Sequence, residues 1–167
     1  NITDKGYGDY VDGNAGFCGD RRTSSGTGTG TSATDYQPYT RISNSSPSLS
    51  CEDADIYTTT DSNTGNKALT QPIGLISVDK VALTGMIWNN ANTGSYLYTN
   101  STYWTMSPYR FDGPGYAIVF VVNGSGTFSN VVVTGASPGI RPVINIRSDT
   151  VLSGSGTSTD PFKVVGA

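Results

Sequence analysis

The chain contains no histidine, so it lacks both the usual proton shuttle near neutral pH and the commonest metal-binding side chain. Ser-His-Asp and Cys-His catalysis and histidine-based zinc or iron sites are therefore excluded. Its only glutamate, Glu52, lies in the densest acidic group of the sequence, which ends at Asp55. Carboxylates this close together on one loop do not face each other across a sugar cleft, as glycosidase chemistry requires. We expect no enzymatic activity, no cofactor and no transition-metal site.

Charged residues are also scarce, at 14% of the chain against about 25% in an average soluble domain. The net charge is −3, and the ten Lys and Arg residues are scattered along the sequence. Binding to nucleic acid is not expected, because it draws most of its affinity from clustered basic side chains. The many Gly, Ser and Thr residues instead indicate a turn-rich surface, which is typical of extracellular β-rich proteins.

Long hydrophobic runs are missing as well. No segment approaches the roughly 20 apolar residues that cross a bilayer, so we expect no membrane insertion by this segment. Asn1 is not an initiator residue, and we expect the chain to be a processed mature form or an excised ectodomain.

Only two cysteines are present, Cys18 and Cys51, and they enclose a stretch rich in Gly, Ser and Thr. Closing such a loop with a disulfide contributes about 3–4 kcal/mol in the loop-entropy model. Two free or metal-ligating thiols are the alternative, but two thiolates make an incomplete zinc site. We predict a disulfide, and with it an extracellular location at the cell surface.

The acidic residues beside Cys51 leave one alternative open. Glu52, Asp53 and Asp55 form a solvated acidic turn in the simplest interpretation. Calcium binding is the second interpretation, because Ca²⁺ takes oxygen ligands from flexible loops, although no spaced Asp-x-Asp-x-Asp-Gly loop is present.

The length of 167 residues fits a single domain, 1–167. Residues 1–69 show little periodicity, and we expect this loop-rich segment, with its disulfide, to wrap a core formed by residues 70–167. Its aromatic side chains argue against disorder, because they repay the entropy cost of ordering. They are Tyr7, Tyr10, Phe17, Tyr36 and Tyr39.

Within the core, residues 70–76 predict a short strand and residues 78–84 a short helix that packs on the core. Ser77 is suited to cap the start of this helix, and Gly85 is suited to the positive φ that ends it.

The strongest strand signal is a hairpin. Residues 116–122 and 128–133 are rich in β-branched and aromatic side chains, and turn residues separate them. Residues 140–146 predict a further strand, and residues 151–152 and 162–165 predict a closing pair. The expected fold class is α+β: an antiparallel sheet core with one or two short helices and extensive loops.

Two motifs flank the hairpin: Trp104-Thr105-Met106-Ser107-Pro108 before it and Gly139-Ile140-Arg141-Pro142 after it. Together they resemble the core of a large bacterial extracellular family with a C-type-lectin-like scaffold. Formylglycine-generating-enzyme-like domains and the variable proteins of diversity-generating retroelements share that scaffold. The resemblance implies a C-type-lectin-like fold in which Trp104 belongs to the packed core. Arg141 is expected either to pair with a buried carboxylate or to cap carbonyl groups.

Activity and calcium chemistry do not carry over with the resemblance. Formylglycine-generating enzymes use cysteines, but both thiols here lie upstream of the matching motifs. Trp88-Asn89-Asn90 is similar to the Trp-Asn-Asp calcium motif of sugar-binding C-type lectins, but Asn90 replaces the carboxylate. We expect no calcium-dependent sugar site there.

The segment from Tyr109 to Gly115 combines two aromatic rings, Arg110 and Asp112 with two glycines that follow them, Gly113 and Gly115. Tyr and Arg are enriched at binding hot spots, and retroelement variable proteins display their ligand surface from this part of the scaffold. A loop that packs its aromatic rings inward is the alternative. We predict an exposed ligand-binding surface formed by Tyr109, Arg110, Phe111, Asp112, Trp88, Tyr96 and Tyr98.

Two functions follow. The first is a non-catalytic bacterial cell-surface recognition or adhesion domain that binds a glycan or protein on another surface. The second is the head domain of a pilin-like or other surface-filament subunit, whose partners are sister subunits.

Overall fold

The computed structural model describes residues 7–59, 65–113, 115–134, 137–157 and 159–166. These residues form a few short helices and mostly antiparallel strands, which agrees with the α+β class. In chain order the elements are η2 (Tyr7–Asp9), β1 (Phe17–Cys18), β2 (Thr23–Ser25), β3 (Thr34–Tyr36), α1 (Gln37–Ser43), η3 (Asp53–Asp55), β4 (Ile56–Tyr57), α2 (Val78–Leu83), β5 (Tyr103–Phe111), β6 (Ala117–Val122), β7 (Phe128–Val132), β8 (Leu152–Ser153) and β9 (Lys163–Val164).

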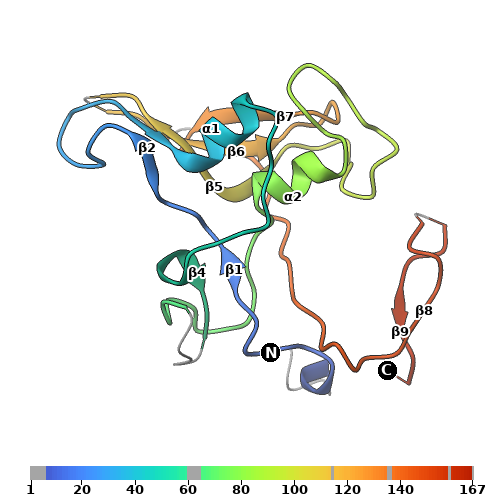
Figure 1. Cartoon of the computed structure of the whole chain (residues 1–167). Helices are drawn as coiled ribbons and strands as arrows, with labels where there is room; N and C mark the ends of the chain where they lie inside the picture. Colours follow the sequence, from blue (N-terminus) through green and yellow to red (C-terminus); the bar gives the residue numbers. More distant parts are fainter. Residues whose placement is uncertain (1–6, 60–64, 114, 135–136, 158, 167) are drawn as a thin grey trace.

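Five strands form the main sheet in the order β2-β3-β5-β6-β7, while β1 pairs with β4 and β8 pairs with β9. Figure 1 shows the sheet and both helices together, with β1 and β4 below them and the β8–β9 hairpin projecting to one side. The first and last described segments meet, because the Tyr10 hydroxyl donates a hydrogen bond to the Gly166 carbonyl at 3.1 Å. None of the helices in these ranges is long or apolar enough to span a membrane.

The predicted hairpin is confirmed. Strands β6 and β7 pair in continuous register from Ile118 opposite Val132 to Val122 opposite Phe128. The Asn123 amide closes the turn by donating to the Thr127 carbonyl at 2.8 Å. Local β propensity and turn chemistry therefore suffice to define this part of the sheet.

Strand β5 is longer and less regular. Its register with β6 shifts on both sides of Pro108, which has no backbone N–H to donate to the ladder. After this irregularity the strand continues, with Arg110 opposite Ile118 and Phe111 opposite Ala117.

The core lies between one face of this sheet and the two α-helices. Phe120 and Phe128 from the sheet meet Val78 and Val81 of α2, and all four side chains are almost fully buried. Helix α1 adds Ile42 to the same cluster.

Helix α2 has the predicted ends. The Ser77 hydroxyl accepts from the Lys80 amide at 3.4 Å, and Gly85 has φ of +84°. Val78 and Val81 face inward while Leu83 is exposed, so the expected core-packing role is confirmed.

The structure differs from the sequence expectation in the segment before residue 70. This segment supplies helix α1 and two strands of the main sheet, β2 and β3. The strands predicted at residues 70–76 and 140–146 are wrong as continuous strands. Each makes isolated bridges instead, such as Gly74 with Val143, because Pro72 and Pro142 cannot donate to a ladder.

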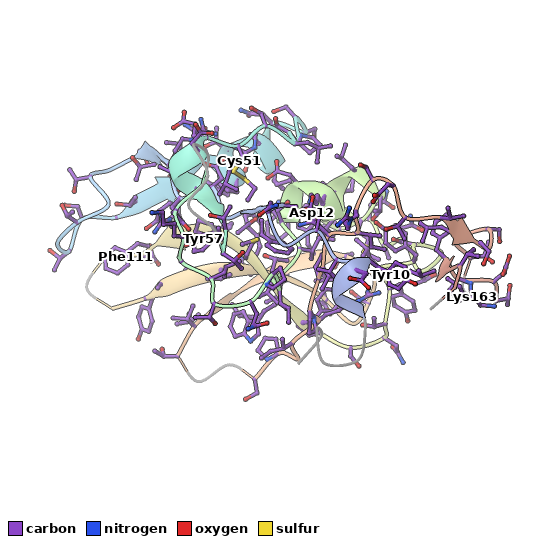
Figure 2. All side chains as sticks on the ribbon, turned by 90° about the horizontal axis from the view of Figure 1, so that it is seen from below. Tyr10, Asp12, Cys51, Tyr57, Phe111 and Lys163 are labelled. Carbon is purple, nitrogen blue, oxygen red and sulfur yellow. A yellow bond between two sulfur atoms is a disulfide. The ribbon has the colours of Figure 1, made fainter. Side chains whose placement is uncertain are left out.

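The Cys18–Cys51 disulfide is confirmed, with the sulfur atoms 2.07 Å apart. It joins the end of β1 to the segment before η3, and Figure 2 shows Cys51 beside these short elements. The bond is compatible with an oxidising, exported environment.

A buried ion-pair cluster lies next to the disulfide. Arg41 of α1 donates to Asp79 of α2 at 2.8 and 2.7 Å and also bonds to Asp20. Arg22 donates to Asp20 at 2.8 Å and to Glu52 at 2.8 Å. The side chains of Asp20 and Asp79 are only 3% exposed, so the two arginines compensate nearly buried charges.

The pKa of Asp20 follows from these neighbours. Burial by itself would raise the pKa of the Asp20 carboxyl. The hydrogen bonds and positive charges of Arg22 and Arg41 outweigh burial and lower that pKa below its ordinary value of 3.8. The folded protein therefore favours the ionised carboxylate.

Replacing Asp20 by Asn should lower the free energy of unfolding at neutral pH by about 2–3 kcal/mol, because Arg41 and Arg22 lose a shared buried partner. Since folding lowers the pKa of Asp20, its contribution is complete above the unfolded pKa of 3.8 and is lost as the pH falls through the folded value. The difference between wild type and Asp20→Asn should therefore shrink on acidification. Urea titrations at neutral pH and below the carboxyl pKa measure this.

Asp149→Asn is the matched control, because Asp149 also pairs with an arginine, Arg147, but at the solvent-exposed surface. Solvent screens such a pair, and this variant should unfold close to wild type. Equal stability of the Asp20 and Asp149 variants would contradict a structural role for the buried cluster.

Candidate functional site

The predicted site residues lie in two separate places. Tyr109, Arg110 and Phe111 belong to strand β5 rather than to a loop, whereas Tyr96 and Tyr98 lie in the segment before β5. Figure 2 places Phe111 at one end of the molecule and Lys163, next to the groove described below, at the other. The structure therefore does not bring the predicted residues together at one surface, and their role in binding stays a prediction.

Tyr109 and Trp88 pack against the core. The Tyr109 ring lies 4.7 Å from the Tyr39 ring and 5.1 Å from the Phe120 ring, between ring centres. Trp88 lies 4.9 Å from Phe128. Edge-to-face contacts of this kind stabilise an interior. The expected exposed loop is not found here, because β5 continues past Pro108 and Tyr109 points to the core side of the strand, as Tyr103 and Thr105 do.

Arg110 contacts other residues of the fold. Its Nε donates to the Asp35 carboxylate at 2.7 Å, and its guanidinium lies over the Tyr39 ring at 5.5 Å. The hydrogen bond from Arg110 is the largest influence on Asp35 and lowers the pKa of that carboxyl. Among the predicted residues of this segment only Asp112 is exposed, in the turn between β5 and β6.

Tyr96 and Tyr98 line a cavity of about 1110 Å³. We call it the aromatic groove. One wall is the loop of residues 92–98, and the other is the β8–β9 hairpin with Phe162. Arg141, the last residue of α2, Leu83, and the following Thr84 complete the lining.

Asn92 fixes the first wall. Its side-chain amide donates to the Thr84 carbonyl at 2.7 Å, and its backbone amide donates to the Gly126 carbonyl at 2.9 Å. Within the wall, the Tyr98 amide donates to the Ser95 carbonyl at 2.9 Å. The loop is thereby tied to both α2 and the β6–β7 turn.

Arg141 fixes the far end of the same wall. Its two terminal nitrogens donate to the carbonyls of Leu97 at 2.8 Å and Tyr96 at 3.2 Å. The Tyr103 hydroxyl also donates to the Leu97 carbonyl at 2.8 Å. Burial raises the pKa of the Tyr103 phenol, which keeps it a neutral donor. The expected carbonyl-capping role of Arg141 is confirmed.

Glycines shape the hairpin wall. Gly156 has φ of +76°, and a Cβ there would lie 2.6 Å from the Phe162 ring. The ring therefore lies directly over Gly156, and 62% of the Phe162 residue surface is still exposed. Sequence reasoning missed Phe162 as a site residue. The sequence signal that could have indicated it is the position of this aromatic residue after a Gly- and Ser-rich turn.

Trp104 does not occupy the expected core position. It is only half-buried, whereas its neighbours Tyr103 and Thr105 are buried. Alternate strand residues point to opposite faces, so Trp104 lies on the face away from the helices.

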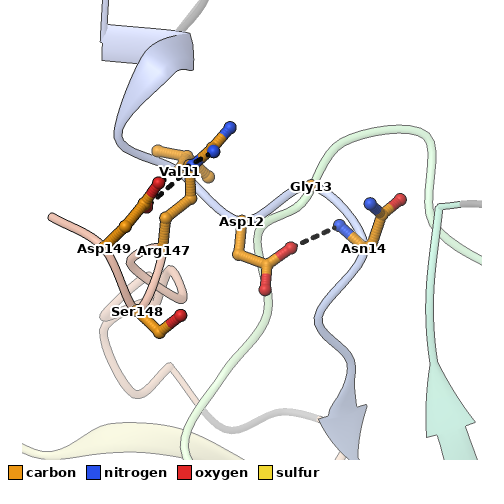
Figure 3. A pocket seen from close by; sticks show the side chains of 7 residues that line it. All are labelled: Val11, Asp12, Gly13, Asn14, Arg147, Ser148 and Asp149. Atoms are coloured by element: carbon orange, nitrogen blue, oxygen red, sulfur yellow. Dashed lines mark hydrogen bonds and ion pairs between the residues drawn. The ribbon is translucent and has the colours of Figure 1, made fainter.

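A second cavity, of about 380 Å³, lies beside Asp12 and Arg147 (Figure 3). The charged groups beside it bind other groups of the protein. The Asp12 carboxylate accepts hydrogen bonds from the backbone amides of Asn14 and Ala15 at 2.9 and 3.2 Å. Arg147 binds Asp149 through two hydrogen bonds of 3.1 Å. These internal hydrogen bonds stabilise the local loop structure, and they favour a structural role over a ligand site.

Two carboxylates of the acidic turn after Cys51 also form ion pairs within the protein. Glu52 pairs with Arg22 at 2.8 Å, and Asp55 pairs with Arg21 at 3.3 Å. In the part of the chain that the structure describes, no group of three or more acidic, cysteine or histidine side chains could hold a metal ion.

Comparison with protein-family models, curated proteins and solved structures found no match to the chain. The C-type-lectin-like scaffold thus stays a proposal that rests on the two sequence motifs. The aromatic groove is the candidate site on its own geometry: exposed rings, neutral polar groups and one arginine, without a pair of groups suited to acid-base catalysis.

Replacing Tyr109 by Ala should lower the free energy of unfolding by about 3–4 kcal/mol, because it empties a space between packed rings. Tyr109→Phe retains the ring and should stay within about 1 kcal/mol of wild type. Denaturant unfolding curves compare the two. A Tyr109→Ala variant as stable as wild type would show that the ring is not part of the core.

Proposed function

We propose that the chain is a non-catalytic recognition domain of a bacterial cell surface, with a C-type-lectin-like scaffold, that binds a glycan in the aromatic groove. The observation that carries this proposal is the presence of two largely exposed rings, Tyr96 and Phe162, in one large concave site. Exposed aromatic rings in a concave site are a feature of binding surfaces.

The polar groups of the groove favour a glycan over an apolar ligand. Thr93, Ser95 and Thr157 contribute neutral hydroxyls beside the rings. A sugar presents both apolar C–H faces, which stack on aromatic rings, and hydroxyls that exchange hydrogen bonds with such groups. The volume of about 1110 Å³ exceeds that of most small-molecule pockets, which are about 300–1,000 Å³, and suits an oligosaccharide.

Other features support an extracellular role. The Cys18–Cys51 disulfide is compatible with export, and charged residues are few. The absence of histidine from the sequence agrees with a role in binding rather than catalysis.

Tyr96→Ala and Phe162→Ala should each weaken glycan binding about tenfold or more, because each removes a stacking surface worth at least about 1.4 kcal/mol. A glycan array followed by calorimetry on the strongest binder measures the effect. Thermal melts should show that Tyr96→Ala is within about 0.5 kcal/mol of wild type, since its side chain is at the surface.

Tyr116→Ala is the matched control, because Tyr116 is also an exposed tyrosine but lies outside the groove. Its binding should equal that of wild type. If the groove variants and the control bind alike, the groove is not the glycan site.

The head domain of a pilin-like surface filament is the second candidate, and the C-terminal hairpin favours it. Val151, Leu152 and Val165 are exposed apolar residues on an element that projects from the body (Figure 1). Contiguous exposed apolar surface of this kind is typical of subunit contacts.

In this second case the protein should self-associate as its concentration rises, and the double substitution Val151→Ser with Val165→Ser should abolish the association. Sedimentation velocity over a concentration series measures it. Leu49→Ser, at another exposed apolar residue, serves as the control and should associate as wild type does. A wild-type chain that sediments as a monomer throughout the series would rule out the hairpin as a subunit contact.

A further inference from the structure

Arg141 differs from the other described arginines in the partners that its charged group has. Its guanidinium donates to two backbone carbonyls, and no carboxylate of the described residues lies within ion-pairing distance of it. Each of the other arginines pairs with at least one carboxylate. These are Arg21 with Asp55, Arg22 with Asp20 and Glu52, Arg41 with Asp20 and Asp79, Arg110 with Asp35, and Arg147 with Asp149.

Among the described residues, no other charged side chain lines the aromatic groove. Its lining consists of apolar, aromatic, amide and hydroxyl side chains together with Arg141, and it contains no Asp, Glu or Lys. The chain as a whole carries a net charge of −3, so a groove whose one charge is positive differs in sign from the average surface. Such a local field attracts an anionic ligand.

Arg141 also has hydrogen-bonding capacity left. A guanidinium carries five N–H donors, and the carbonyls of Leu97 and Tyr96 accept from one terminal nitrogen each. These two bonds fix the plane of the group against the Tyr103 ring, 5.5 Å away. The remaining donors are pre-oriented, which favours a planar anion such as a carboxylate.

We propose that the glycan bound in the aromatic groove is an acidic saccharide whose carboxylate binds to Arg141. This inference rests on the proposed function. One cation suits one carboxylate, whereas densely phosphorylated or sulfated ligands require clustered basic side chains. The exposed rings of Tyr96 and Phe162 stack on the sugar faces while Arg141 selects the charge.

The test uses the unmodified protein and matched ligands. An oligogalacturonate and a sialylated trisaccharide are each compared by calorimetry with the same saccharide after reduction of its carboxyl group to an alcohol. Each acidic form should bind about tenfold or more tightly than its reduced form, and added salt should narrow the difference. Binding of the acidic form at least tenfold tighter for either pair supports the proposal.

A substitution in the wall tests the charge without disturbing the bonds of Arg141. Thr93→Asp places a negative charge in the groove lining, and Thr31→Asp places one in the β2–β3 turn. Thr93→Asp should weaken the acidic saccharide about tenfold and leave the reduced form unchanged. Thr31→Asp should leave both forms unchanged.

The outcomes separate this inference from the proposed function. Equal binding of acidic and reduced saccharides to the wild type, lost in Tyr96→Ala, would overturn the choice of an acidic ligand and keep the glycan groove. Binding of an acidic peptide with no binding of any saccharide would overturn both. Equal loss in Thr93→Asp and Thr31→Asp would show that Arg141 does not select the charge.

Discussion

The buried bonds of Arg41 to Asp79 and Asp20 are the interaction on which the rest of the structure depends. Helices of six and seven residues are too short to be stable alone, so α1 and α2 need tertiary partners. Arg41 joins the two helices and ties both to the segment after β1. The position of α2 in turn sets the Thr84 carbonyl, which holds Asn92 and the groove wall that follows it. The candidate site thus depends on a cluster in which Asp20 and Arg41 are far from it in sequence.

Features defined by local signals could be predicted from the sequence. The β6–β7 hairpin has its own turn, α2 has its own cap residues, and the two cysteines have no competitor. Helix α1 could not be predicted in this way, because it lies within a Gly-, Ser- and Thr-rich segment that shows little periodicity. Its stabilising partner, Asp79, contacts Arg41 only in the folded chain. Strand β3 likewise depends on a distant contact, since Asp35 pairs with Arg110 of β5.

The candidate site was only partly predictable, for a related physical reason. Aromatic rings beside an arginine and an aspartate have the same sequence pattern whether they bind a ligand or close a core. Tyr109 packs on the rings of Tyr39 and Phe120, and Arg110 bonds to Asp35. These partners are distant in sequence, so no local pattern reveals them. Tyr96 and Tyr98 are close in sequence and both line the groove, but Phe162 joins them only through the placement of the hairpin.

The choice of arginine at position 141 exceeds what the scaffold requires. Capping the carbonyls of Leu97 and Tyr96 needs donors but no net charge, and a half-buried cation without a carboxylate carries a desolvation cost. Elsewhere in the described chain the fold offsets that cost with a carboxylate beside each arginine. At the aromatic groove the described residues supply none. A ligand that brings its own carboxylate would offset the cost on binding, which couples the recognition of charge to the same bonds that hold the groove wall in place.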